Sequence, residues 1–186
     1  AYFTNPAWLQ ALIAQGALGQ KTRCGIFRKQ GKEIQVLDLK AQDYRKSAAE
    51  VAEEVDAILK MKNPAEKFAA LRASAQPQAQ FLWAIFRDIF HYAAVQLENV
   101  ADNARDLDLA MRWGFGWSQG PFETWQAAGW SDIAQAIAAD IAAGKAMSAT
   151  PLPAWVLDSG RTGVHTGQGS YSASRNAYVA RSALPV

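Results

Sequence analysis

The feature that most constrains the fold is a glycine pattern that occurs twice in the chain. Residues 16–27 read GALGQKTRCGIF and residues 160–171 read GRTGVHTGQGSY, and a Pro-Ala-Trp sequence precedes each copy. Both follow the order Gly-x-x-Gly-x-basic-Thr-x-x-Gly-x-aromatic, with Lys21 and then His165 at the basic position. Glycines at fixed spacing usually mark positive-φ backbone or a close backbone approach. The repeat therefore predicts two equivalent tails, each closing a small helical unit.

The repeat also predicts how the chain is divided. We expect the tail of a first unit over 1–47, a helical connector over 48–79 and a complete second unit over 80–180. Because nothing helical precedes the first tail and the chain opens without Met, we expect it to be part of a longer protein. The alternative is that two similar glycine-rich turns arose separately.

Helix start and stop signals dominate the remaining sequence. Asparagine or proline precedes several apolar segments of helical period, and glycine follows them. Gly114 is expected to stop the helix that Asn103 caps, and Ser131 to cap the last helix. The predicted helical segments span 6–15, 46–75, 80–99, 104–113, 121–128 and 132–145.

The strand signal is weaker than the helix signal. Only the runs GIFRK and IQVLDL, separated by a turn at Gly31, are typical of a small hairpin. No alternation of strands and helices predicts a parallel sheet. The predicted fold class is therefore mainly α, with glycine-rich tails and one short hairpin.

Composition narrows the class of protein. The chain is 50% hydrophobic with a net charge of +2, which is typical of a soluble globular protein and gives no reason to expect a nucleic-acid partner. The most apolar segment, 81–100, carries Arg87, Asp88 and His91 at its middle, so it predicts a buried helix rather than a membrane span. A single cysteine and no visible secretory signal favour a reducing cytoplasm.

No catalytic or metal-binding constellation stands out. His91 and His165 have no Ser, Cys or carboxylate arranged beside them as a triad, so both are interpreted as core or interface residues. Cys24 is interpreted as a structural thiol, and the carboxylates of 98–108 as helix caps and solvated groups. We therefore expect neither a catalytic residue nor a metal ligand.

The glycines of residues 114–120 do not form a dinucleotide fingerprint. Their spacing is Gly-x-Gly-x-x-x-Gly, and a helix rather than a strand precedes them. We interpret them as a turn between helices, at a corner packed by Trp117, Trp125 and Trp130.

Two motifs together resemble the C-terminal helical domain of 3-hydroxyacyl-CoA dehydrogenases. Residues 108–130, DLAMRWGFGWSQGPFETWQAAGW, contain that domain's Asp, Ala-Met pair, glycine-rich turn, Gly-Pro-Phe and final glycine. The domain closes with Gly-x-Leu-Gly-x-Lys-Thr-Gly-x-Gly-Phe-Tyr; residues 16–27 resemble this tail, and 160–171 a degenerate second copy. Two tandem copies are similar to multifunctional β-oxidation proteins, which also carry an enoyl-CoA hydratase domain.

The resemblance implies roles for two residues. Lys21 matches the family lysine near the nicotinamide cofactor, although Arg23 stands where a glycine is usual. Trp113 matches an aromatic residue near the acyl-CoA. The alternatives are a surface lysine and a hydrophobic plug between helices. The family's Asn-Arg pair is replaced by Trp83-Ala84, which implies that the second unit is a packing partner rather than a catalytic copy.

The resemblance implies that the chain is the C-terminal helical region of a cytoplasmic, NAD-dependent 3-hydroxyacyl-CoA dehydrogenase of fatty-acid β-oxidation. It would support the substrate cleft and an interface, with a homodimer as one allowed arrangement. The NAD-binding domain with the catalytic His and Glu would lie upstream, so the isolated chain is expected to be inactive. The alternative is a non-enzymatic helical interaction module with tryptophan anchors.

Overall fold

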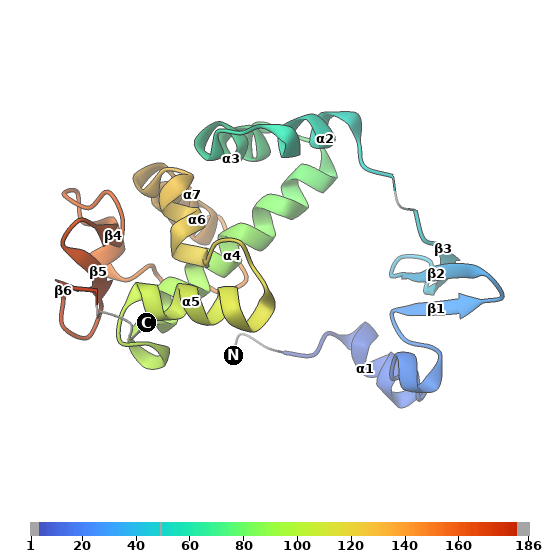
Figure 1. Cartoon of the computed structure of the whole chain (residues 1–186). Helices are drawn as coiled ribbons and strands as arrows, with labels where there is room; N and C mark the ends of the chain where they lie inside the picture. The colour runs from blue at the N-terminus through green and yellow to red at the C-terminus, as the bar shows by residue number, and fades with distance from the viewer. Residues whose placement is uncertain (1–3, 49, 182–186) are drawn as a thin grey trace. The chain divides into compact units, whose positions relative to one another are not determined.

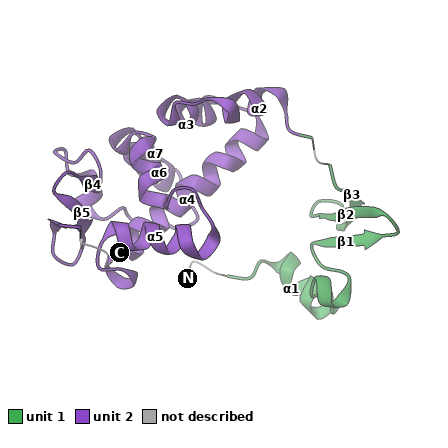
Figure 2. Cartoon of the chain, in the orientation of Figure 1, with its two compact units in different colours: residues 1–50 green, residues 51–186 purple. Residues whose placement is uncertain are grey.

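The chain forms two compact units, residues 1–50 and 51–186, in the computed structural model (Figures 1 and 2). The structure describes residues 4–48 and 50–181. Within these ranges no helix is long and apolar enough to cross a membrane.

The first unit is a short helix followed by a three-stranded antiparallel sheet. Helix α1 (Ala7–Ala14) stops before Gly16, whose φ of 73° lies in the left-handed region. A 3₁₀ turn, η1 (Gln20–Thr22), leads to β1 (Phe27–Gln30), β2 (Glu33–Asp38) and β3 (Asp43–Lys46), in the order β1-β2-β3. The hairpin predicted at Gly31 is therefore confirmed, whereas β3 was not predicted.

The second unit is built around one long helix, α4 (Pro77–Val100), which contacts α3, α5, α6 and α7 (Figure 1). The other helices of this unit are α2 (Glu53–Lys60), α3 (Pro64–Ala73), α5 (Ala104–Phe115), α6 (Pro121–Ala127) and α7 (Trp130–Ala142). Residues 47–52 form no helix among those described, so the helical prediction that began at 46 is wrong there.

The start signals of the helices were predicted better than the stops. The Asn103 side chain accepts hydrogen bonds from the backbone N–H groups of Arg105 and Asp106, as a cap should. Gly114, however, lies inside α5, which ends at Phe115 and is followed by Gly116 with φ 69°. Glycine is tolerated within a helix, and the left-handed position is the one that ends it. One start signal was also wrong, because Gly129 rather than Ser131 precedes α7.

Buried charge and aromatic rings link α4 to its neighbours. Arg87 of α4 pairs with Asp88 at 2.9 Å and with Asp140 of α7 at 3.3 Å. Burial alone would lower the pKa of Arg87, but hydrogen bonds and charge from both carboxylates raise it. Trp125 stacks on Phe90 at 5.5 Å and on Trp130 at 4.3 Å, so the predicted packing of Trp125 and Trp130 is confirmed.

The second tail forms a second small sheet. A 3₁₀ turn, η2 (Ala154–Leu157), precedes β4 (His165–Thr166), β5 (Gly169–Ser172) and β6 (Ala177–Val179), which pair antiparallel in the order β4-β5-β6. The helical character of the domain is thus confirmed, but two sheets stand where one hairpin was predicted. Trp117 is 37% exposed and faces Phe115, so its predicted burial at the corner is wrong.

Candidate functional site

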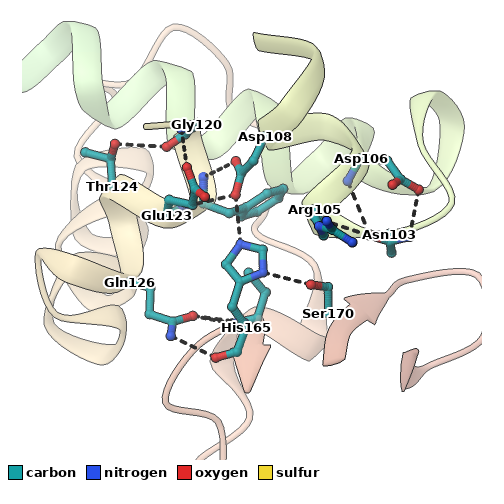
Figure 3. Close-up of polar contacts among 12 residues, drawn as sticks. Asn103, Arg105, Asp106, Asp108, Gly120, Glu123, Thr124, Gln126, His165 and Ser170 are labelled. Atoms are coloured by element: carbon teal, nitrogen blue, oxygen red, sulfur yellow. Dashed lines mark hydrogen bonds and ion pairs between the residues drawn. The ribbon is translucent and has the colours of Figure 1, made fainter. Parts of the chain in front are cut away.

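A polar network centred on His165 joins the second tail to α5 and α6 (Figure 3). The His165 Nε2 atom lies 2.8 Å from Oδ2 of Asp108, and Nδ1 lies 3.0 Å from Oγ of Ser170. The prediction that His165 has no such neighbours is therefore wrong. The three residues are far apart in sequence, and only the docking of the tail onto α5 brings them together.

Asp108 also explains the Gly-Pro-Phe motif. Its carboxylate accepts hydrogen bonds from the N–H groups of Phe122 (2.9 Å) and Glu123 (3.1 Å), at the start of α6. A Cβ on Gly120 would overlap Asp108, so only glycine permits this approach of α6 to α5. Proline at the first helical position has no N–H to satisfy. The motif therefore places the first residues of α6 against the buried carboxylate of Asp108.

Burial and the hydrogen-bond partners of Asp108 shift its pKa in opposite directions, and burial has the larger effect. Burial raises the pKa of the Asp108 carboxyl, although the hydrogen bonds from His165 and Phe122 act in the opposite direction. Ser170 is buried in the central strand β5, and both ring nitrogens of His165 already have partners. The network contains the residue types of a catalytic triad, but its geometry instead holds the second tail against α5 and α6. We call this network the Asp108 lock.

Gln126 of α6 makes a second lock on the same tail. Its Oε1 accepts from the N–H groups of Val164 (3.0 Å) and His165 (2.9 Å), and its Nε2 donates to the carbonyl of His165 at 2.9 Å. A Cβ on Gly163 would collide with this side chain. The glycine pattern of the second tail is therefore a docking surface for α6.

The two residues assigned to ligands lie in different units. Lys21 is an exposed residue of η1 in the first unit. Trp113 lies on α5 in the second unit and is 72% exposed, so it is not a plug between helices. His91 is buried, with Nε2 2.8 Å from the carbonyl of Thr150. In the described part of the chain, no group of three His, Cys, Asp or Glu residues is placed to hold a metal ion.

The fold and the Asp108 lock define a helical domain whose closing tail is pinned to its own helices. Residues 83–173 match the family model described as 3-hydroxyacyl-CoA dehydrogenase, C-terminal domain. This segment contains Asp108, the Gly-Pro-Phe motif and the second tail through Tyr171. The second unit therefore contains a segment that matches the C-terminal domain of the 3-hydroxyacyl-CoA dehydrogenase family.

Two curated relatives are similar to the chain. A probable 3-hydroxyacyl-CoA dehydrogenase of Bacillus subtilis is 32% identical over 133 residues, which are 72% of this chain and 17% of that protein. A putative fatty acid oxidation complex trifunctional enzyme of Rickettsia felis is 27% identical over 138 residues, or 70% of this chain and 18% of that protein. The chain thus spans less than a fifth of either relative. No solved structure matches it.

Proposed function

We propose that the chain is the C-terminal helical region of a cytoplasmic, NAD-dependent 3-hydroxyacyl-CoA dehydrogenase that acts in fatty-acid β-oxidation. The observation that carries this proposal is the family match over residues 83–173, because the same segment contains the Asp108 and Gln126 locks. Both curated relatives have names in this area of metabolism and are several times longer than the chain. The region would support the acyl-CoA cleft and a subunit interface.

The chemistry would be carried by an NAD-binding domain outside residues 1–186. His91 and His165, the two histidines of the chain, are both engaged in internal hydrogen bonds. We therefore expect the isolated chain to show no oxidation of NADH with acetoacetyl-CoA, whereas the longer protein does. Appreciable turnover by the isolated chain would overturn this division of labour.

Lys21 and Trp113 are the residues that we propose to meet cofactor and substrate. Both are exposed, as such roles require. In the longer protein, Lys21→Ala should raise KM for NADH and Trp113→Ala should raise KM for the acyl-CoA, each with little change in kcat. Lys32→Ala and Phe81→Ala, at other exposed positions, are the matched controls. Equal changes in KM for the control and test variants would contradict the assignment of Lys21 to the cofactor and Trp113 to the substrate.

The first unit is proposed to be the tail of an earlier copy of the domain. It has an apolar cavity of about 1030 Å³, lined by Leu9, Leu12, Ile13, Leu18, Ile26 and Ile34. Gly19 corresponds to Gly163 in the repeat, but a Cβ added to Gly19 would meet no atom within 4 Å, whereas one on Gly163 would collide with Gln126. We propose that a helical bundle of the same kind as α4–α7, in the longer protein, covers this cavity. The following connector would then lead to the second unit.

The second candidate function is a non-enzymatic interaction module. An exposed group of aromatic residues at the end of α5, Trp113, Phe115 and Trp117, favours it, because such residues are common anchors at interfaces. Sedimentation of the isolated chain distinguishes a homodimer from a monomer. A strand, a Gly-x-Gly-x-x-Gly turn and a helix upstream in the parent gene would favour the dehydrogenase; their absence would favour the module.

A further inference from the structure

The first unit leaves most of its large apolar side chains exposed. Among its described residues, Leu12 is the one buried hydrophobic residue. The large hydrophobic residues that are between 44% and 60% exposed are Ile13, Leu18, Ile26, Phe27, Ile34 and Leu39. A unit of this size is stable by itself only if it buries most of its apolar surface or is stapled, and its one cysteine is free. The first unit therefore needs a surface outside itself to cover it.

The apolar cavity of the first unit has positive charge in its wall. The cations that line it are Arg23, Arg28 and Lys29. No Asp or Glu residue of the described chain lines it. The two carboxylates of β2 are paired with cations of β3, Asp38 with Arg45 at 3.2 Å and Glu33 with Lys46 at 3.6 Å. Charge complementarity therefore favours a covering surface that is apolar at its centre and acidic at its edge.

The second tail shows how the basic residue of the repeat meets a covering helix. His165 stands at the position of Lys21, and its Nε2 atom lies 2.8 Å from Oδ2 of Asp108 on α5 (Figure 3). The Asp108 side chain is buried and also accepts hydrogen bonds from the first N–H groups of α6. The basic position of the repeat is thus paired with a buried carboxylate that caps a helix.

Lys21 has the charge for the same contact. Its side chain is exposed, and within residues 4–48 and 50–181 no hydrogen bond or ion pair involves its ammonium group. That group carries three N–H donors, so one carboxylate partner leaves donors for the cofactor contact proposed above. Lys21 is not among the residues that line the apolar cavity, so a small ligand inside the cavity would not be its partner.

We propose that the first unit docks onto an acidic helical surface of the longer protein, in which a buried carboxylate pairs with Lys21 as Asp108 pairs with His165. This inference rests on the proposed function, because it treats residues 16–27 as the tail of an earlier copy of the domain. The occupant is a pair of helices of the same kind as α5 and α6. Its apolar side chains fill the cavity, and a side chain beside Gly19 takes the place that Gln126 has beside Gly163.

Hydrogen–deuterium exchange of the longer protein without NADH tests the proposal. Lys21→Met removes the charge and keeps much of the length of the side chain. We expect the amides of residues 18–24 to exchange about tenfold faster in this variant, which corresponds to one charge-assisted contact. Lys21→His, which copies the second tail, should stay within about threefold of wild type. Lys32→Met, at an exposed position outside the cavity wall, is the matched control and should leave the rates unchanged.

The 186-residue chain tests whether the two basic positions are equivalent. His165→Lys and His165→Met both remove the imidazole contact with Ser170, so the difference between them reports on the pairing with Asp108. We expect the amides of residues 160–171 to exchange about tenfold faster in His165→Met than in His165→Lys. Equal rates in the two variants would overturn the equivalence and the inference with it.

The outcomes in the longer protein separate this inference from the proposed function. If residues 16–27 exchange slowly in wild type but Lys21→Met matches Lys32→Met, the inference is wrong and the proposed function stands. Fast exchange of residues 16–27 in wild type overturns both. If removal of bound lipid abolishes the slow exchange, a lipid rather than a helical surface fills the cavity, and the inference is wrong.

Discussion

The two glycine-rich tails share a sequence pattern but differ in what covers them. In the second tail Tyr171 is 1% exposed and its ring centroid lies 4.8 Å from that of Trp155, and Gly163 packs against Gln126. In the first tail the corresponding Phe27 is 56% exposed, and a Cβ added to Gly19 would meet no atom within 4 Å. The pattern of the second tail therefore forms a surface that helices of its own unit cover, and we propose that helices outside residues 1–186 cover the first tail.

The shared threonine has a similar role in both tails. Thr22 donates to the carbonyl of Cys24 at 2.9 Å, and the N–H of Gln168 donates to Thr166 Oγ1 at 3.2 Å. Each hydroxyl thus closes its own loop. The loops are held locally, whereas the burial of the aromatic residue depends on tertiary packing.

The largest expected effect contrasts the two aromatic positions. Tyr171→Ala should destabilise the second unit by about 3–5 kcal/mol, because it empties a buried site against Trp155 and Arg161. Phe27→Ala should change the stability of the isolated chain by less than about 0.5 kcal/mol, since its ring is largely exposed. Urea unfolding followed by circular dichroism measures both. Equal losses would break the comparison between the tails.

The next effect tests whether the first tail is covered in the longer protein. Leu18→Asp should leave the isolated chain within about 0.5 kcal/mol of wild type. In the longer protein it should cost about 2–3 kcal/mol, because the carboxylate would be buried without a partner. Val51→Asp, at an exposed apolar position outside the cavity, is the control. The same small effect of Leu18→Asp in both proteins would count against a covering bundle.

A smaller effect concerns the lock between α6 and the second tail. Gln126→Ala removes the partners of the Val164 and His165 N–H groups and should cost about 1–2 kcal/mol. Those two amides should also exchange with solvent faster. Gln135→Ala, on the exposed side of α7, should be nearly neutral. Unchanged exchange at 164 and 165 would show that Gln126 is not what holds the tail.

The smallest effect is a pH dependence at Asp108. Because burial raises the pKa of its carboxyl, the stability that it contributes is fully present below its unfolded pKa, about 3.9, and is lost as pH rises through the folded pKa. Asp108→Asn should therefore gain stability relative to wild type as pH rises through the acid range. Unfolding in a His165→Gln background separates this from imidazole titration. A difference that falls with pH would contradict the direction given.

The features that the sequence predicted are mostly local ones. Asn103 and Pro121 start their helices, and Gly31 turns the first hairpin, because each signal acts through its own backbone. The sequence predicted the end of this helix at Gly114 rather than at Gly116, because either glycine could follow a helix. The backbone φ angle, which is positive at Gly116, is what distinguishes the two positions. Local patterns therefore give the elements but not all of their ends.

The site depends on contacts between distant segments. Asp108, His165 and Ser170 meet only after the tail has docked, and no spacing rule joins α5 to β4. One signal was present in the sequence: the repeat places His165 at the position of Lys21, so a polar side chain at this point of the tail is a shared feature. The resemblance identified the family, and the structure supplied the reason for its Gly-Pro-Phe motif.

Hydrogen–deuterium exchange of the two tails tests the central claim most directly. Amides of residues 16–27 and 160–171 are compared in the isolated chain and in the longer protein. We predict slow exchange at 160–171 in both, and fast exchange at 16–27 that becomes slow only in the longer protein. Fast exchange at 16–27 in both proteins would contradict the account of the first tail as the end of a dehydrogenase unit.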